Sequence, residues 1–254
     1  MEPIGSRQAQ AKGERTCALI VIGNEILSGK VRDTNAYFAV RELRAVGVAL
    51  KRIVVVPDEL AAIAEEVRYC ASRYDVVITS GGVGPTHDDL TVEGVARAFG
   101  RRLVVNPQLE QIVCEQFGGA SQAAGMKMAL TPEGAILNFG GELRYPTVQV
   151  ENVYMLPGIP QLFEAKLLAL KDRLATDPYF MRAIYIRAPE SVIAEHLTAC
   201  LQRFPDLMLG SYPILGNPEY RVKVTLESKD QAYLGAAYEY LMQLLPEGSV
   251  VRTE

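Results

Sequence analysis

The sequence predicts an α/β domain built on a mostly parallel sheet, followed by a smaller α+β domain. Short apolar runs alternate with helical patterns over the first two thirds of the chain, which is typical of β-α-β units. Beyond residue 177 the order of the expected elements becomes βαββαβ, typical of a ferredoxin-like unit. A length of 254 residues is consistent with two unequal domains.

The first domain is expected over residues 16–176, behind a loose polar tail at 1–15. Its strands are expected at 16–22, 48–56, 75–80, 102–105 and 152–156, with hairpin strands within 135–150. Its helices are expected at 35–46, 60–70, 90–99, 107–117 and from Pro160 to Leu174. In the first helix Tyr37, Val40, Leu43 and Val46 fall at three-residue steps, which is the spacing of a helix, and Asp58 is expected to cap the second helix. Residues 118–125 have the composition of a mobile loop.

The second domain is expected over residues 177–254, after a boundary at Thr176-Asp177-Pro178. Its strands are expected at 182–187, 207–213, 219–227 and 249–252, and its helices at 190–203 and 229–245. His196 lies in the first of these helices and is interpreted as structural. The tyrosines of this domain are interpreted as packing and surface residues, because basic residues do not cluster around them in the sequence. They are Tyr212, Tyr220, Tyr233, Tyr238 and Tyr240.

Composition excludes several function classes. Lys and Arg number 26 against 30 Asp and Glu, so a strongly basic nucleic-acid binder or a polybasic membrane-surface protein is not expected. No apolar run reaches the roughly 18 residues of a membrane span, and the tail lacks the apolar core of a signal peptide. The four cysteines have no metal-ligand spacing and are interpreted as free thiols of a reducing compartment, which favours the cytoplasm.

The loop Ser80–Asp89 (SGGVGPTHDD) is the most informative segment for function. Three glycines within four residues let the backbone approach a ligand and point its N–H groups at an anion. No Lys follows them, which disfavours a Walker ATPase, and the spacing is not that of a dinucleotide fold. The pair Asp88-Asp89 has two readings of equal weight, a helix cap or a functional pair that shares a divalent cation with a phosphate. His87 is read as a solvated loop histidine.

Two further loops follow strands at the same expected edge, 23–35 and 157–160. Glu25 and Asp33 in the first loop, and Asp58 at the end of a neighbouring strand, are additional oxygen donors. Each alone is read more readily as a cap or turn residue. Together with the Asp88-Asp89 pair they favour a metal-assisted anion site at one edge of the sheet.

The three loops carry a family resemblance. GNEILSGKVRDTNA, SGGVGPTHDDLT and LPGIP resemble, in order, the signatures of the molybdopterin-binding (MoaB/Mog-like) domain. Their order and the trailing small domain are similar to competence/damage-inducible protein A (CinA-like) proteins. VPDE at 56–59 and LGSYP at 209–213 are most similar to the molybdopterin-binding-like domain of FAD synthases. The resemblance runs from Thr16 to Arg252 and implies a three-layer α/β/α first domain.

The resemblance also implies roles for individual residues. Asp89 and Asp58 match acids used near the phosphate and metal, and with Asp88 they form the expected catalytic set, in which Asp88 and Asp89 hold the metal. The implied ligand-binding residues are Gly23, Glu25, Asp33, Thr34, Asn35, Ser80, Gly81, Gly82, Gly84, Pro85, Thr86, Pro157, Gly158 and Pro160. CinA-like proteins usually carry Lys where this chain has His87, so one positive charge is weaker here at neutral pH.

Three functions are consistent with these features. The first is hydrolysis of nucleotide pyrophosphates such as ADP-ribose or FAD, with Mg²⁺, Mn²⁺ or Co²⁺. The second is a non-catalytic module that binds a pterin or an adenine nucleotide. The third, a molybdopterin adenylyltransferase, ranks lower because the small C-terminal domain is foreign to that branch. The resemblance implies a homo-oligomer, a dimer or trimer, and the remaining partner is a small-molecule ligand rather than nucleic acid or membrane.

Overall fold

The structure, a computed structural model, describes residues 14–117 and 125–254. It divides into two compact units, one ending at Thr176 and one running from Asp177 to Glu254. Most of the expected tail at 1–15 and of the expected loop at 118–125 lies outside the described residues. Within the described part no helix is long and apolar enough to cross a membrane. The four cysteines are free thiols, as the sequence predicts.

The described part of the first unit is built on a sheet with the strand order β2-β1-β3-β8-β7-β6. The first four strands run parallel, and β7 and β6 run antiparallel to their neighbours. Their bounds are β1 Arg15–Ile22, β2 Val48–Val56, β3 Val76–Ser80, β8 Val153–Leu156, β7 Thr147–Val150 and β6 Ile136–Asn138. The prediction of a mostly parallel sheet is confirmed. The expected strand at 102–105 is β4 (Leu103–Val105), which pairs with β5 (Leu130–Pro132) in a separate two-stranded sheet.

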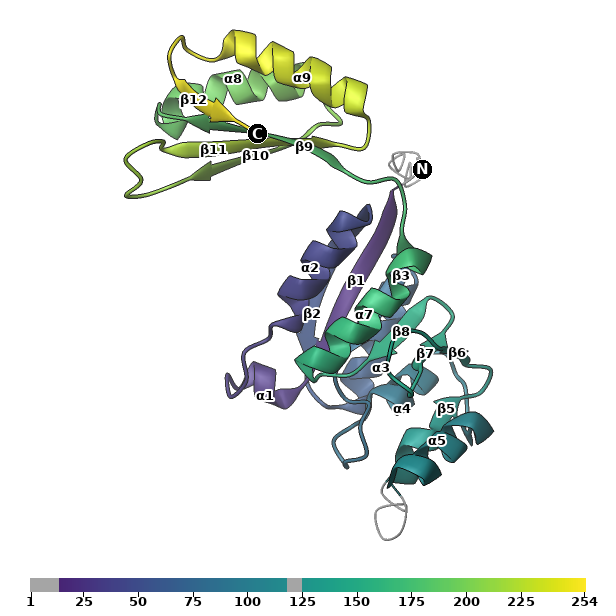
Figure 1. The fold of residues 1–254 in the computed structure, drawn as a ribbon. Helices are drawn as coiled ribbons and strands as arrows, with labels where there is room; N and C mark the ends of the chain where they lie inside the picture. Colours follow the sequence, from purple (N-terminus) through teal and green to yellow (C-terminus); the bar gives the residue numbers. More distant parts are fainter. Residues whose placement is uncertain (1–13, 118–124) are drawn as a thin grey trace, which may run out of the picture. The chain divides into compact units, whose positions relative to one another are not determined.

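Helices cover both faces of the large sheet, which confirms the three-layer arrangement (Figure 1). Alternate residues of β1 supply both cores: Leu19 faces one and Ile20 the other. The Leu19 core contains α2 (Asn35–Ala45) and α7 (Pro160–Leu174). The Ile20 core contains α3 (Leu60–Ala71), α4 (Thr91–Ala98) and α5 (Pro107–Phe117). Two short helices complete the described part, α1 (Asn24–Leu27) and the 3-10 helix η2 (Met126–Ala129).

The apolar residues spaced along the helix predicted at 35–46 do not all face the core: Leu43 is buried and Val46 packs against the core, but the other two do not. Tyr37 is 69% exposed and Val40 39% exposed, whereas Asn35, Ala39 and Leu43 are buried. The buried residues lie four apart, so the helix is rotated from the orientation that its larger apolar residues predict. The physical reason is at the first residue of the helix, where the Asn35 side chain is hydrogen-bonded to two other loops. The hydrogen bonds of Asn35 thus set how α2 is rotated about its axis, and the side chains of Tyr37 and Val40 are left exposed to solvent.

The N-cap predicted for α3 is also wrong. The helix begins after Glu59, without a side-chain cap, and the Asp58 carboxylate instead accepts a hydrogen bond from the Asn24 backbone N–H at 2.7 Å. The same holds for the cap reading of the acidic pair, because α4 begins after Leu90 and has no side-chain cap. These carboxylates therefore act in the loops rather than at helix ends.

The second unit has the predicted βαββαβ order. Its elements are β9 Phe180–Ile186, α8 Glu190–Arg203, β10 Met208–Pro213, β11 Val222–Ser228, α9 Gln231–Leu244 and β12 Val250–Thr253. The strands lie in the order β10-β11-β9-β12, and all neighbours are antiparallel, which is the ferredoxin-like arrangement. Both helices pack on one face, over Ile184, Ile186 and Val224. Asp230 caps α9 by accepting from two backbone N–H groups.

Candidate functional site where three strand-end loops meet

The order of the strands decides where a ligand can bind. β1 lies between β2 and β3. The next strand in the chain, β2, is its neighbour on one side within the sheet, and the strand after that, β3, is its neighbour on the other side. In open α/β sheets, ligands bind at this switch point, outside the carboxyl ends of the strands. Here Gly23 follows β1 and Gly81 follows β3, while Pro157 and Gly158 follow the adjacent β8. The three loops singled out in the sequence therefore end at one edge of the sheet.

The glycine loop is built so that only glycine fits at its first two positions. Gly81 has φ 105° and Gly82 has φ 65°, in the left-handed region. A Cβ on Gly81 would lie 2.2 Å from the Ile22 carbonyl oxygen, and one on Gly82 would lie 2.3 Å from Thr91 Oγ1. Thr91 is fully buried, and its hydroxyl donates to the Gly81 carbonyl oxygen at 2.7 Å. Sequence reasoning did not assign Thr91 a role, although it is the last residue of the quoted loop motif.

Asn35 joins all three loops. Its Nδ2 donates to Ser80 Oγ at 2.9 Å, beside the glycine loop, and to the Gly158 carbonyl oxygen at 2.8 Å. Gly158 in turn lies so close to Gly81 that a Cβ on it would come within 3.2 Å of the Gly81 Cα. Asn35 is 5% exposed, and its Oδ1 has no hydrogen-bond partner in the protein. Residues from the ends of β3 and β8 and from the start of α2 are thereby held in contact.

The remaining residues of the first loop have mainly local roles. The Asp33 carboxylate accepts from the Ala36 backbone N–H at 3.2 Å, which supports the start of α2. Thr34 precedes that helix without a side-chain cap. The exposed Glu25 carboxylate folds over Gly23, where a Cβ would lie 2.5 Å from its Oε1. Asp58 holds the same loop through the Asn24 N–H.

The two aspartates of the acidic pair have different surroundings. Asp89 Oδ2 accepts hydrogen bonds from the Thr86 N–H at 2.8 Å and from the Thr86 hydroxyl at 2.5 Å, which closes the turn beneath Gly84. The Asp88 side chain is 60% exposed and lies 3.9 Å from the His87 ring nitrogen. The Thr86 hydroxyl, the backbone N–H of Asp88 and the charges of His87 and Lys127 lower the pKa of the Asp88 carboxyl. Asp88 is therefore an ionised carboxylate facing solvent at the rim of the loop.

Lys127 is a site residue that sequence reasoning missed. It lies on η2, 41 residues after Thr86, and its Nζ donates to the Thr86 carbonyl oxygen. The next residue of η2, Met128, accepts from the Tyr145 hydroxyl at 2.5 Å, which holds this segment in place. Lys127 brings a positively charged side chain to the glycine loop. No local pattern marks it, because it reaches the loop through tertiary packing.

The expected residues thus fall into two groups. At the sheet edge Asn35 joins Ser80 to Gly158, Gly158 lies against Gly81, and Gly82 packs against Thr91. The rim consists of residues that are half-buried or exposed: Gly84, Pro85, Thr86, His87, Asp88, Asp89, Pro157 and Pro160. Among residues 14–117 and 125–254, no group of three or more His, Cys, Asp or Glu side chains is arranged to hold a metal ion. The acids of the first loop and the acidic pair therefore do not form one cluster.

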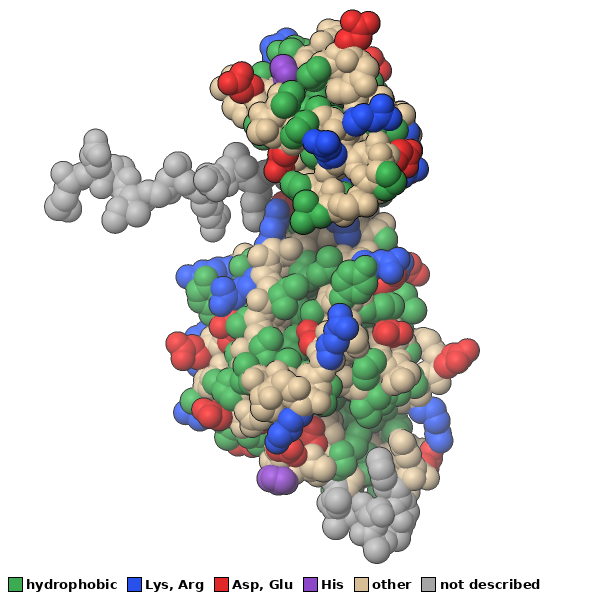
Figure 2. Space-filling view, turned by 90° about the vertical axis from the view of Figure 1, so that its left-hand side faces the viewer, with side chains coloured by type: hydrophobic (Ala, Val, Ile, Leu, Met, Phe, Trp, Pro, Cys, Tyr) green, Lys and Arg blue, Asp and Glu red, His purple; other side chains and the backbone are tan. Residues whose placement is uncertain are grey.

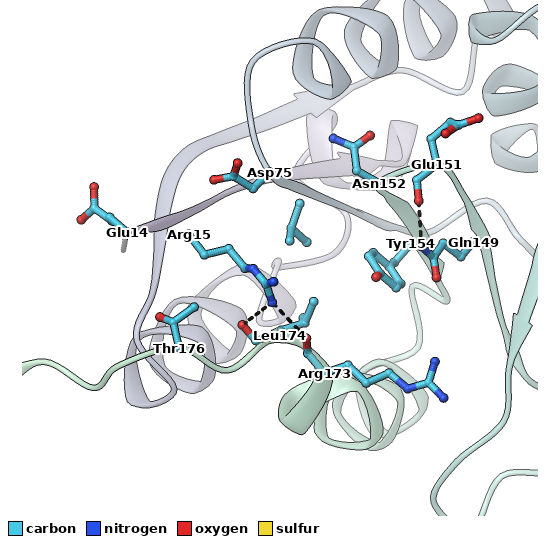
Figure 3. A pocket seen from close by; sticks show the side chains of 11 residues that line it. Glu14, Arg15, Asp75, Gln149, Glu151, Asn152, Tyr154, Arg173, Leu174 and Thr176 are labelled. Carbon is cyan, nitrogen blue, oxygen red and sulfur yellow. Dashed lines mark hydrogen bonds between the residues drawn. The ribbon is translucent and has the colours of Figure 1, made fainter. Parts of the chain in front are cut away.

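A cavity of about 570 Å³ lies at the opposite edge of the same sheet (Figure 3). Its polar groups already have structural roles. Arg15 donates to the carbonyl oxygens of Arg173 and Leu174 at the end of α7, and Asp75 accepts from the backbone and hydroxyl of Thr16. The strand-end loops, rather than this cavity, have the glycine backbone that suits an anion. Over the first unit, the face shown in Figure 2 has acidic and basic side chains interspersed, without a patch of one sign.

Comparison with known proteins places this geometry in a family. Residues 18–176 match the model described as a probable molybdopterin binding domain, and residues 178–254 match the model described as the middle domain of FAD synthase. A solved structure of the protein CinA from Thermoplasma acidophilum, of unknown function, is 32% identical with a TM-score of 0.59. The match covers 63% of this chain and 98% of the CinA chain in that structure.

Relatives with similar sequences have different lengths. An Archaeoglobus fulgidus protein is 33% identical and covers 89% of this chain and 96% of its own length. A probable FAD synthase of Caenorhabditis briggsae is 34% identical over 91% of this chain, and a CinA-like protein of Gemmatimonas aurantiaca is 32% identical over 84% of it. The chain spans about half of each of these two relatives, 50% and 54%. It belongs to the family of the probable molybdopterin binding domain, of CinA-like type, and carries after that domain the middle domain of FAD synthase.

Proposed function

We propose that this protein is a divalent-metal-dependent hydrolase of nucleotide pyrophosphates such as ADP-ribose or FAD. The observation that carries the proposal is the ionised, exposed Asp88 carboxylate on a loop in which Gly81 and Gly82 adopt positive φ. The relatives named probable FAD synthase support the substrate class, because FAD contains a pyrophosphate between two nucleotides.

The residues present fit a hard divalent cation. Mg²⁺ in phosphate sites is typically held by one or two carboxylates together with substrate phosphates and water, so it does not need a closed cage of protein ligands. Asp88 and Asp89 are the residues that would hold it, and the Asp88 side chain is 60% exposed to solvent. When bound, such a cation offsets the charge that develops on the bridging oxygen and lowers the pKa of a bound water.

The chain itself supplies binding and orientation. The Gly81 N–H already donates to the Leu156 carbonyl oxygen, so the backbone N–H groups from Gly82 to Gly84 are the ones that donate to one phosphate, and Thr91 keeps that backbone in place. Lys127 contributes positive charge beside the same phosphate. Asp58 holds the first loop at the edge of the sheet by accepting a hydrogen bond from the Asn24 N–H.

A second function is favoured by one specific observation. Asp89 is engaged by Thr86, and Asp58 by Asn24, so two of the three expected catalytic acids already have hydrogen-bond partners. A site with a single uncommitted carboxylate is compatible with a module that binds a pterin or an adenine nucleotide without cleaving it.

The deciding experiment compares Asp88→Asn with wild type on ADP-ribose and FAD, each assayed with Mg²⁺, Mn²⁺ and Co²⁺. Because the Asp88 side chain is 60% exposed, the variant should fold normally and lose activity by about 100-fold or more. Glu65→Gln, which removes an exposed acid from α3, is the matched control and should keep full activity. Undiminished hydrolysis by Asp88→Asn would contradict the proposal. Tight binding of these compounds by wild type without any product would favour the binding module.

The expected dimer or trimer and the expected cytoplasmic location stay predictions.

A further inference from the structure

The small sheet of the second unit has one face that its own helices do not cover. α8 and α9 both pack against the face formed by Ile184, Ile186, Val222 and Val224 (Figure 1). Successive residues of a strand point to opposite faces, so Tyr185 and Lys223 belong to the other face. We call this second face the open face of the small sheet.

A row of aromatic and cationic residues crosses the open face. Tyr212, Lys223, Tyr185 and Arg252 are paired partners on the four adjacent strands β10, β11, β9 and β12. The Arg252 guanidinium lies 4.0 Å from the centre of the Tyr185 ring, and Lys223 Nζ lies 5.4 Å from it. The Tyr220 ring packs edge-on against Tyr185, with centroids 4.8 Å apart. The cationic side chains gather around Tyr185, which was not among the tyrosines singled out from the sequence.

Two further arginines stand beside this row. Ile186 and Val222 are the last paired residues of β9 and β11. Arg187 comes directly after Ile186, and Arg221 comes directly before Val222. The Arg221 N–H donates to the Ile186 carbonyl oxygen at 2.8 Å. Like charges on adjacent strands destabilise a sheet. Both arginines are exposed, and no acidic side chain of the described residues pairs with either. Glu254 is already engaged, by Arg252 at 3.0 Å and by the Tyr185 hydroxyl at 2.8 Å.

Tyr212 offers an aromatic surface at the other end of the row. Its ring lies against Gly210, where a Cβ would come within 2.5 Å of the Tyr212 hydroxyl oxygen. The glycine allows the ring to lie on its own strand, and the residue remains 51% exposed. A flat ring with one face in solvent is suited to stacking on a nucleotide base.

We propose that the open face is a second ligand site and binds a nucleoside diphosphate. Arg187 and Arg221 hold the diphosphate, which also relieves their mutual repulsion, and the base stacks on Tyr212. Four cations partly offset by Glu254 suit one diphosphate better than an extended nucleic-acid strand, which requires a longer basic track. This site is separate from the glycine loop and does not depend on the function proposed for that loop.

The test is calorimetry on the full chain, with ADP and inorganic pyrophosphate as probes and no divalent metal present. Arg187→Gln or Arg221→Gln should weaken both probes by roughly 10-fold or more. Tyr212→Ala should weaken ADP and leave pyrophosphate unchanged. Arg203→Gln, which removes an exposed charge from α8 on the helical side of the sheet, should bind both probes like wild type.

Thermal unfolding of the unliganded variants provides the folding control. Removing one of two neighbouring like charges should leave the unfolding midpoint unchanged or raise it, so weaker binding cannot be attributed to unfolding. Unchanged affinity for ADP in Arg187→Gln and Arg221→Gln would overturn the proposal, as would the absence of binding to wild type at millimolar ADP. Tighter binding of a single-stranded oligonucleotide than of ADP, lost in the same variants, would assign the face to nucleic acid and would also overturn it.

Discussion

The replacement Asn35→Ala tests the central feature of the candidate site, the contact between three loops. In wild type the buried Asn35 Nδ2 donates to Ser80 Oγ and to the Gly158 carbonyl oxygen. Alanine leaves both acceptors without this donor. A net hydrogen bond contributes about 1 kcal/mol, and a buried acceptor left unpaired costs about 1–3 kcal/mol. Because Ser80 can reorient its hydroxyl and the partnerless Oδ1 disappears too, we expect a loss of about 2 kcal/mol.

A loss of this size is measurable by calorimetry. For a domain of about 150–250 residues, 1 kcal/mol corresponds to a shift of about 2–4 °C in the unfolding midpoint, so Asn35→Ala should lower it by about 4–8 °C. Since the chain has two units, two transitions can occur, and only the one of the first unit should move. Asn24→Ala is the control, because it removes an amide from an exposed residue of the first loop and keeps the backbone N–H that Asp58 accepts.

The functional consequence separates a site from a mere fold contact. If the loops form one ligand site, Asn35→Ala should weaken nucleotide binding at temperatures where the variant is still folded, while Asn24→Ala should not. A variant that unfolds at the wild-type temperature and binds like wild type would refute the reasoning.

Two further predictions concern buried polar groups. Thr91→Val keeps the side-chain volume but removes the hydrogen bond to the Gly81 carbonyl oxygen, so stability should fall by about 1–2 kcal/mol in urea unfolding, and no loss would contradict the role given to Thr91. Burial lowers the pKa of Lys166 to about 8. Between that pH and the ordinary lysine pKa of about 10.4, the unfolded chain binds more protons than the folded protein, so stability gains with rising pH. The free energy of unfolding of wild type, measured relative to that of Lys166→Met, should therefore rise between about pH 8 and about pH 10. A difference that stays constant with pH would show that folding does not lower the pKa of Lys166.

Local patterns were sufficient for much of the fold. The strand at 48–56 and the helices at 107–117, 160–174 and 190–203 lie where the sequence predicts them, because each has a clear period and a clear end signal. The α2 helix shows the limit of this reasoning. Its spacing predicted a helix, but not which side faces the sheet, since the contact of Asn35 with two remote loops outweighed the apolar residues Tyr37 and Val40.

The candidate site divides in the same way. By itself the sequence determined that three strand-end loops carry glycines and acids, because backbone freedom and charge are properties of each residue type. Only the tertiary structure decided that Asn35 meets Ser80, 45 residues away, and Gly158, 123 residues away, and that Lys127 reaches the glycine loop. It also decided that Asp89 is held by Thr86 while Asp88 faces solvent. Such contacts depend on strand order and register, which bring together residues whose local patterns contain no information about one another.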